Sequence, residues 1–276
     1  MSAAEHRADR HLVALDIDGT ILHEDGSVSA RVQRAVSAVV AAGHELMIAT
    51  GRSMDTTLPV LRQLGITPEH TVCSNGAVTI RRESGDDAEP VRYRKEFIET
   101  FDPSAVLMTI REALQGAHYA VEDRDGFYRH TEQFPSGAVG RMSEQVPFEG
   151  LLGMEATRVV VISPNHGMED FLKIVEQMGL HRVSYAVGWT AWLDIAPDGV
   201  NKATALERLR EQLDIPRERV VAVGDGRNDV EMLQWAGAHG RGVAMGQAPP
   251  DVLAACSQVT APVVQDGLAD VLESLL

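Results

Sequence analysis

Two aspartates placed two residues apart follow an apolar run near the start of the chain. Residues 12–15 read Leu-Val-Ala-Leu, and residues 16–20 continue as Asp-Ile-Asp-Gly-Thr. Because residues i and i+2 of a strand point to the same side, we expect Asp16 and Asp18 to converge on one point. Two carboxylates this close repel each other unless a cation lies between them, and Mg²⁺ prefers oxygen ligands with a phosphate completing its shell. The pattern favours a Mg²⁺ and phosphate site over the alternative, a polar turn that closes a strand.

A second acidic cluster closes another apolar run late in the chain. Residues 220–223 are Val-Val-Ala-Val, and Gly-Asp-Gly-Arg-Asn-Asp follows them. Asp225 can supply a further carboxylate for the cation, with Asn228 and Asp229 beside it to hold ligands or waters. Acidic residues also favour the start of a helix, so a capped helix is the alternative. Two such clusters, each after a buried strand, favour a shared site.

Thr50, Gly51 and Arg52 follow a third apolar run, at residues 45–49. Thr50 can donate a hydrogen bond to a phosphate oxygen, and the N-terminus of the helix predicted for residues 54–64 can add backbone N–H groups. The alternative is that Thr50 only caps this helix.

Lys202 and Asn75 are further candidates, and each also has an ordinary structural explanation. Lys202 follows a Gly-Val-Asn turn and is placed in the first turn of a helix predicted to run to residue 213, where its charge could meet a bound phosphate. Most lysines on helices, however, are solvated surface groups. Asn75 follows a short strand at residues 71–73, but Asn-Gly is a turn signal by itself.

The elements that would position these residues alternate between strands and helices. Short apolar strands are predicted at residues 12–15, 45–49, 71–73, 219–223 and 242–245. With helices between most of them, this alternation predicts an α/β fold with a Rossmann-like parallel sheet, which binds ligands at the carboxyl ends of its strands. The candidate residues follow strand ends or begin helices, so we expect them to meet at that edge.

The middle of the chain lacks this alternation. Its strand-like and helical segments are predicted at residues 105–115, 119–122, 157–162, 168–178 and 183–187. Strands and helices without strict alternation predict an α+β insert over an antiparallel sheet. We therefore expect a core domain of residues 1–80 and 193–276 and an inserted lobe of residues 81–192.

Composition limits the kind of molecule that the site serves. The 276 residues include 40 acidic and 25 basic ones, a net charge of −15, which argues against a nucleic-acid surface. Two cysteines, Cys73 and Cys256, are too few for a disulfide framework or a zinc cluster. The chain has no run of about 20 apolar residues and no signal-peptide core in residues 1–11. We expect a cytoplasmic monomer or homodimer that acts on a small molecule, not on nucleic acid or a membrane.

The Asp-x-Asp, Thr-Gly-Arg, lysine and Gly-Asp-x-x-Asn-Asp elements occur here in the order typical of one family. The chain resembles the haloacid dehalogenase-like (HAD) hydrolases, a superfamily of mostly Mg²⁺-dependent phosphotransferases. The position of its insert resembles the type C2 cap of the Cof-type subfamily, class IIB. The sequences at residues 74–77, 199–202 and 243–246 also resemble Cof-type signatures. One departure is Val263 and Gln265, where relatives often carry Asn and Glu.

The resemblance implies a role for each candidate residue. Asp16 would attack phosphorus to form an aspartyl-phosphate, and Asp18 would protonate the leaving alcohol and then activate water. Mg²⁺ would be held by the Asp16 carboxylate, the Asp18 backbone carbonyl and Asp225. The transferring phosphoryl oxygens would be bound by Thr50, Gly51 and Lys202. A cap that opens and closes would admit substrate and exclude water. Supporting residues would be Arg52, Asn75, Asn228 and Asp229.

The implied function is a phosphatase that hydrolyses a small phosphate monoester through an aspartyl-phosphate. A sugar phosphate is the leading substrate, with pyridoxal phosphate or flavin mononucleotide (FMN) as further candidates. A phosphomutase that uses the same aspartyl-phosphate is the alternative, and a non-catalytic phosphate-binding module is a more remote one. Substrate choice would be made in the cap. For each candidate there, taken alone, a surface or core position is favoured over one that faces the site: His118, Tyr119, Arg124, Tyr128, Arg129, His130 and Trp189.

Overall fold

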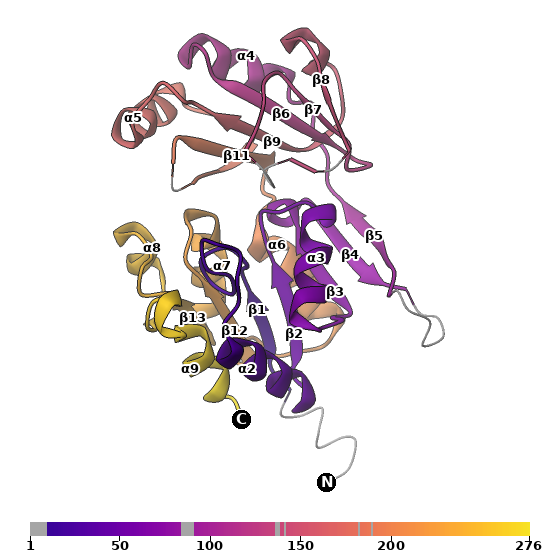
Figure 1. The fold of residues 1–276 in the computed structure, drawn as a ribbon, viewed down its shortest axis with the longest axis vertical. Coiled ribbons are helices and arrows are strands. Elements are labelled where there is room, and N and C mark those ends of the chain that lie inside the picture. Colours follow the sequence, from indigo (N-terminus) through magenta and orange to yellow (C-terminus); the bar gives the residue numbers. More distant parts are fainter. Residues whose placement is uncertain (1–9, 84–90, 136–138, 141, 182, 189) are drawn as a thin grey trace.

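The computed structural model describes residues 10–83, 91–135, 139–140, 142–181, 183–188 and 190–276. These residues form two lobes, one above the other in Figure 1, each built around its own β-sheet. We call the lower one, with the eight-stranded sheet, the core lobe, and the upper one, with the six-stranded sheet, the insert lobe. The predicted α/β fold with a parallel-sheet core and an α+β insert is confirmed.

Parallel strands make up most of the core sheet. Its strands are β1 (Leu12–Leu15), β2 (Glu45–Ala49), β3 (His70–Cys73), β4 (Val78–Arg82), β5 (Tyr93–Ile98), β12 (Val220–Gly224), β13 (Arg241–Ala244) and β14 (Gln258–Val259). They lie in the order β14-β13-β12-β1-β2-β3-β4-β5, parallel as far as β3 and antiparallel beyond it. Because β1 pairs in parallel with both β2 and β12, the residues that follow these three strands emerge side by side.

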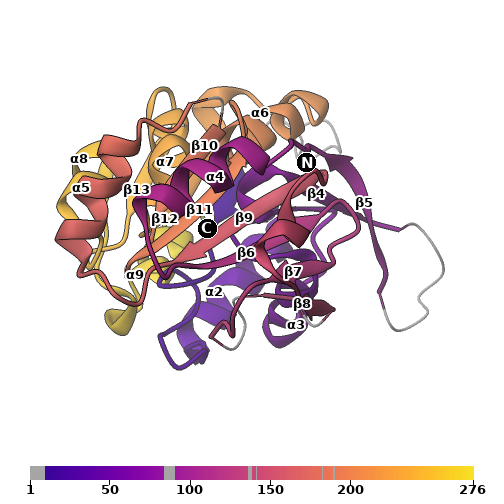
Figure 2. The same ribbon diagram turned by 90° about the horizontal axis from the view of Figure 1, so that it is seen from above.

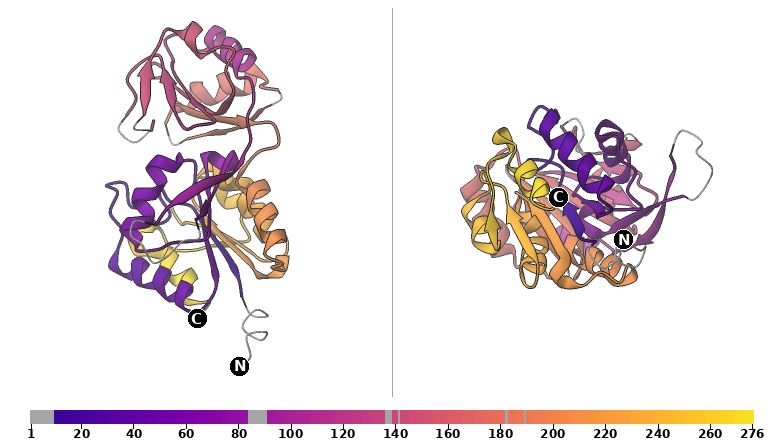
Figure 3. Two further views of the ribbon diagram at one scale, coloured as in Figure 1. Left: turned by 90° about the vertical axis from the view of Figure 1, so that its right-hand side faces the viewer. Right: turned by 90° about the horizontal axis from the view of Figure 1, so that it is seen from below.

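Helices cover both faces of the core sheet. They are α2 (Ala30–Ala41), α3 (Met54–Leu64), α6 (Lys202–Gln212), α7 (Val230–Gly237), α8 (Pro250–Ala255) and α9 (Gly267–Glu273). One face carries α2, α3 and α9, and the other carries α6 and α7, as the left view of Figure 3 shows. β1 is buried on both sides, with Val13 and Leu15 on the first face and Leu12 and Ala14 on the second. Among the helices of the described residues, none has the length and apolarity that crossing a membrane requires.

The insert lobe is a sheet covered by helices on one face. Its elements are α4 (Ser104–Ala113), β6 (His118–Asp123), β7 (Tyr128–His130), β8 (Ser143–Gln145), β9 (Ala156–Ile162), α5 (Met168–Met178), β10 (Val183–Val187) and β11 (Trp192–Pro197). The strand order is β10-β11-β9-β6-β7-β8, antiparallel except between β7 and β8. α4 and α5 lie on the face away from the core lobe, as Figures 1 and 2 show. The bare face of the sheet therefore looks toward the core lobe.

The sheets divide the chain at residues that differ from the predicted limits of 81 and 192. The antiparallel strand β5 extends the core sheet to Ile98, and β11 belongs to the insert sheet as far as Pro197. The antiparallel pair β4–β5 breaks the β-α alternation while still adding to the core sheet, so sheet membership alone does not follow the alternation from which the limits were predicted. The polar turn between these two strands, residues 84–90, lies outside the described residues.

The close contact between β13 and α7 depends on Gly242. A Cβ atom added there would lie 1.9 Å from the carbonyl oxygen of Leu233. We expect Gly242→Ala to lower the free energy of unfolding by roughly 2–3 kcal/mol, because strand and helix would have to move apart. Urea unfolding followed by circular dichroism measures this change.

Gly167→Ala is the matched control for that variant. Nothing lies within 4 Å of the Cβ position at Gly167, and its φ of −69° suits any residue. We expect a smaller loss of roughly 0.5–1 kcal/mol, because alanine is a poorer N-cap than glycine but its Cβ meets no other atom here. Equal losses in the two variants would contradict the packing argument.

Candidate active site

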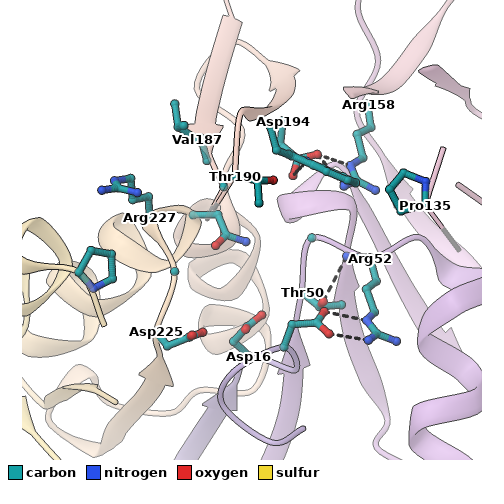
Figure 4. Close-up of a pocket in the computed structure, with 18 residues that line it drawn as sticks. Asp16, Thr50, Arg52, Pro135, Arg158, Val187, Thr190, Asp194, Asp225 and Arg227 are labelled. Carbon is teal, nitrogen blue, oxygen red and sulfur yellow. Dashed lines mark hydrogen bonds and ion pairs between the residues drawn. The ribbon is translucent and has the colours of Figure 1, made fainter. Parts of the chain in front are cut away.

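The polar residues predicted from the sequence meet at the carboxyl edge of the core sheet. Asp16 follows β1, Thr50 follows β2, and Asp225 follows β12. Figure 4 shows the side chains of Asp16 and Asp225 pointing toward a common space, with Thr50 nearby. Asp16 is 5% exposed, Thr50 1% and Asp225 2%. The edge is therefore a buried polar site and not a set of solvated turns.

Lys202 lies at the centre of this site. Its Nζ donates to Oδ1 of Asp16 and to Oδ1 of Asp229, both at 2.7 Å, and its side chain is fully buried. The other oxygen of Asp229 accepts the backbone N–H groups of Asp225 and Gly226, at 3.0 and 2.9 Å. Lys202 thus joins the loop after β1 to the loop after β12, and the solvated-lysine alternative is wrong.

The site holds more negative than positive charge. Asp16, Asp225 and Asp229 each place a carboxylate oxygen within 4.8 Å of the others. Burial raises the pKa of Asp16 well above its ordinary value, against the opposing effect of Lys202. Burial and the charge of Asp229 raise the pKa of Asp225 to about 7. Burial alone would lower the pKa of Lys202, but its two carboxylate partners outweigh this and raise it. An added cation would stabilise the ionised carboxylates.

The donor set at this cluster suits a hard metal ion. Both oxygens of Asp229 already accept hydrogen bonds, from Lys202 and from two backbone N–H groups. Asp225 accepts only long hydrogen bonds, at 3.4 Å from Thr20 and from Gln247, so Asp16 and Asp225 are the carboxylates of the cluster best able to take a metal. Oxygen ligands alone are typical of Mg²⁺ and Ca²⁺ sites and not of zinc sites with Cys or His. The acidic cluster could bind a metal ion of that class.

Gly19 and Gln247 hold the loop after β1 against Asp225. A Cβ atom on Gly19 would lie 2.0 Å from Oδ2 of Asp225, and the φ of Gly19 is +76°, so glycine is required there. The Gln247 amide donates to the Gly19 carbonyl at 2.6 Å and to Oδ2 of Asp225 at 3.4 Å. Its carbonyl accepts the backbone N–H of Val263 at 2.9 Å. Sequence reasoning missed Gln247, whose only signal was its position directly after residues 243–246.

Asp18 lies apart from the carboxylate cluster. The guanidinium of Arg52 binds both oxygens of Asp18, with Nε 2.7 Å from Oδ2 and Nη2 on Oδ1. The Asp18 side chain is 59% exposed, against 7% for that of Asp16. Strand alternation does not bring the two carboxylates to one point, because β1 ends at Leu15 and a turn follows. Both side chains still line the same pocket.

Thr50, Asn75 and Asn228 form a second polar group beside the cluster. The Thr50 hydroxyl oxygen accepts the Arg52 backbone N–H at 3.1 Å, and the Thr50 carbonyl accepts that of Asn75 at 3.0 Å. The side-chain oxygen of Asn75 accepts the amide of Asn228 at 3.0 Å. Gly51 fits against this pair, since a Cβ there would lie 3.1 Å from the Asn75 oxygen. Asn75 therefore links the loops after β2 and β12 and does more than form a turn.

A pocket of about 420 Å³ lies between this edge and the insert lobe (Figure 4). Asp16, Asp18 and Asp225 line it from the core lobe. Pockets of roughly 300–1,000 Å³ bind small molecules. The insert-lobe residues that line it include Arg158, Trp192 and Asp194.

The insert-lobe residues of this pocket differ from those considered from the sequence. Trp189 lies outside the described residues, and six others do not line the pocket: His118, Tyr119, Arg124, Tyr128, Arg129 and His130. Trp192 and Asp194 were missed, although strand alternation carries a signal for them. Leu193, between them on β11, points into the core of the insert lobe, so its two neighbours point toward the core lobe.

The chain is similar to known phosphatases over nearly its whole length. A family model of the haloacid dehalogenase-like hydrolases matches residues 13–272. The 5-amino-6-(5-phospho-D-ribitylamino)uracil phosphatase YitU of Bacillus subtilis is 27% identical over 94% of this chain and 95% of its own length. An HMP-PP phosphatase of Yersinia enterocolitica is 27% identical over 87% of this chain and 85% of its own length.

Solved structures share the same two-lobed fold. A haloacid dehalogenase-like hydrolase from B. subtilis has a TM-score of 0.78 at 22% identity and covers 96% of this chain and 100% of its own. A sugar phosphatase of HAD subclass IIB has a TM-score of 0.75 at 21% identity, with 96% and 100% covered. These likenesses extend over both lobes.

The raised pKa of Asp225 predicts that the metal-free protein loses stability as pH rises. Its pKa is about 7 in the folded protein against an ordinary 3.8, so the folded state keeps a proton that the unfolded chain releases between these values. This contribution is present below about pH 4 and is lost as pH rises through 7. In EDTA at pH 8, we expect Asp225→Asn to be more stable than the wild type by roughly 1–4 kcal/mol.

Urea unfolding at pH 5 and pH 8 measures this difference, which should shrink at the lower pH. Asp25→Asn is the matched control, because Asp25 lies on an exposed turn and its pKa is lowered by hydrogen bonds from Ser27. If the wild type and Asp225→Asn were equally stable at both pH values, the raised pKa of Asp225 would be refuted.

Proposed function

This chain belongs to the haloacid dehalogenase-like hydrolase family and is a phosphatase, and we propose that it hydrolyses a small phosphate monoester through an aspartyl-phosphate on Asp16. The observation that carries the proposal is the 2.7 Å contact between Asp16, which lines the pocket, and the fully buried Lys202, which does not. A buried lysine keeps one oxygen of the carboxylate in place and leaves the group beside a space of substrate size. This is the geometry that a positioned nucleophile needs.

Asp16 and Asp18 carry the two chemical steps. A carboxylate oxygen of Asp16 bonds to phosphorus, the bond from phosphorus to the ester oxygen breaks, and Asp18 gives its proton to the departing alcohol. Water then attacks the phosphorus of the aspartyl-phosphate, and Asp18 takes a proton from that water. Inorganic phosphate leaves, and the Asp16 carboxylate is restored. In the structure both oxygens of Asp18 accept hydrogen bonds from Arg52, so Asp18 must leave Arg52 to carry the proton.

Other residues of the edge bind the phosphoryl group. Lys202, the Thr50 hydroxyl and the backbone at Gly51 offer donors for its oxygens, and preorganised donors of this kind supply much of the rate in phosphoryl transfer. Asp229 orients Lys202, and Asn75 and Asn228 fix the two loops against each other.

Mg²⁺ is the metal that we propose for the acidic cluster. HAD hydrolases generally use a metal ion, and the oxygen-only donors fit Mg²⁺. The Asp16 carboxylate, the Asp18 backbone carbonyl and Asp225 would hold it, and when bound it supplies positive charge to the phosphoryl oxygens.

We propose that the insert lobe acts as a cap that selects the substrate. Its bare sheet face closes the pocket above the acidic cluster. Among the relatives, YitU is named for a phosphate ester with a ribityl chain and a uracil ring. A sugar phosphate, pyridoxal phosphate or FMN is our candidate substrate class. The net charge of −15 supports a small-molecule substrate over nucleic acid.

Replacing the nucleophile tests the mechanism. Asp16→Asn should lower phosphate release from a panel of monoesters by roughly 10³-fold or more, as removal of a catalytic nucleophile does. Asp25→Asn, a matched change on an exposed turn, should keep wild-type rates. Full activity in Asp16→Asn would exclude Asp16 as the nucleophile.

Removing the metal tests the proposed cofactor. Phosphate release should stop in excess EDTA and return when Mg²⁺ is added beyond the chelator, because the buried carboxylates would otherwise repel the anionic ester. The malachite green assay for free phosphate follows both stages. Undiminished turnover in EDTA would rule out the metal-assisted mechanism.

A further inference from the structure

Most polar side chains that line the pocket beyond the acidic cluster are already paired. Arg227 donates to Asp251 at 2.6 Å, and Asn228 donates to Asn75 at 3.0 Å. Arg158, in the insert lobe, is likewise paired with Asp194. Thr190 adds a hydroxyl to the lining, whereas the apolar lining is contributed by Pro135, Ala186, Val187, Trp192 and Pro249.

Trp192 is held in a fixed orientation on this wall. Its indole N–H donates to Oδ2 of Asp194 at 2.9 Å. The other oxygen of Asp194 accepts Nε and Nη2 of Arg158, both at 2.6 Å. Gly188 leaves room beside the ring, since a Cβ there would lie 3.1 Å from the Trp192 Cβ. The half-buried indole is therefore an apolar ring held in one orientation before any ligand binds.

The residues that hold the Trp192 ring are also connected to the core lobe. Arg158 is 5% exposed and its Nη1 donates to the Tyr128 hydroxyl at 3.3 Å. Glu122, buried next to this pair, accepts the Ser74 hydroxyl of the core lobe at 2.7 Å. This polar chain fixes where the insert sheet, and with it Trp192, stands relative to the strand ends that carry the acidic cluster.

The wall suits a flat apolar group better than a polyhydroxylated one. Each sugar hydroxyl that enters a pocket loses water and needs a free partner, and the charged groups of this wall are engaged with one another. An aromatic ring instead gains from stacking on a fixed indole and from burying apolar surface.

We propose that Trp192 is a specificity-determining residue that stacks on a planar aromatic or heteroaromatic ring in the alcohol part of the substrate. This inference rests on the proposed function, and it narrows the substrate class within it. The ring would lie between Trp192 and the apolar lining, with the phosphate at Asp16.

Esters that share a primary alcohol but differ in the attached group test this inference. We would measure kcat/KM for benzyl phosphate, cyclohexylmethyl phosphate and ribose 5-phosphate. The wild type should prefer benzyl phosphate over both others. Trp192→Leu should lower kcat/KM for benzyl phosphate about 10-fold more than for ribose 5-phosphate, because it removes a stacking partner. Trp192→Phe should retain most of the preference.

A binding measurement and a matched control make the outcome specific. Calorimetric titration of benzyl phosphate into the Asp16→Asn protein should show a Kd about 10-fold higher once Trp192→Leu is added. Trp235→Leu should leave the substrate preference unchanged, since Trp235 donates to Glu207 outside the pocket.

The two hypotheses fail in different ways. Suppose that ribose 5-phosphate is hydrolysed in an Asp16-dependent way and that Trp192→Leu loses neither the preference nor the affinity for benzyl phosphate. This result would overturn the role of Trp192 and leave the proposed function standing. Ring-selective binding that Trp192→Leu abolishes, without turnover of any ester, would support the role of Trp192 and overturn the proposed function.

Discussion

A buried ammonium group between two buried carboxylates is the interaction on which the rest of the site depends. Removing an ion from water costs of the order of several kcal/mol, so Lys202 is stable there only because Asp16 and Asp229 both contact it at 2.7 Å. Asp229 is held in turn by the backbone of the Gly224–Gly226 turn, and a Cβ on Gly224 would lie 2.4 Å from its carboxyl carbon. With Asp225 beside them, the group keeps a surplus of negative charge that a cation would relieve.

The connection back from the insert lobe carries two pocket-lining residues and Lys202 in one short segment. β11 carries Trp192 and Asp194 on the wall of the pocket, and α6 begins at Lys202. The turn at residues 74–76 packs closely against this connection, since a Cβ on Gly76 would lie 2.2 Å from the Asn201 carbonyl oxygen. A shift of the insert lobe would therefore act on Lys202, which contacts Asp16.

The core and its acidic cluster could be predicted from the sequence because both follow from local patterns. Apolar runs that alternate with helices imply a parallel sheet, and polar residues at the ends of its strands must meet at one edge. Asp16 and Asp225 are found by this reasoning alone. Lys202 begins a helix, and only the neighbouring candidates distinguish it in the sequence from a solvated surface lysine.

Contacts between distant segments could not be predicted in the same way. No local pattern predicts that Gln247 contacts Gly19, 228 positions away. Nor does one predict that the Asp18 side chain points toward Arg52 and not toward Asp16. The face of the insert sheet that looks toward the core lobe could be identified only once the structure showed which face α4 and α5 cover. The addition of β5 to the core sheet, without a helix before it, also has no local signal.

Rapid acid quenching during turnover of a radiolabelled phosphate ester tests the central claim most directly. If Asp16, held by Lys202, is the nucleophile, label should be trapped on the protein, map to the peptide that contains Asp16, and be released by hydroxylamine as an acyl phosphate is. Phosphate release with no labelled protein at any time, or label on another residue, would contradict the account.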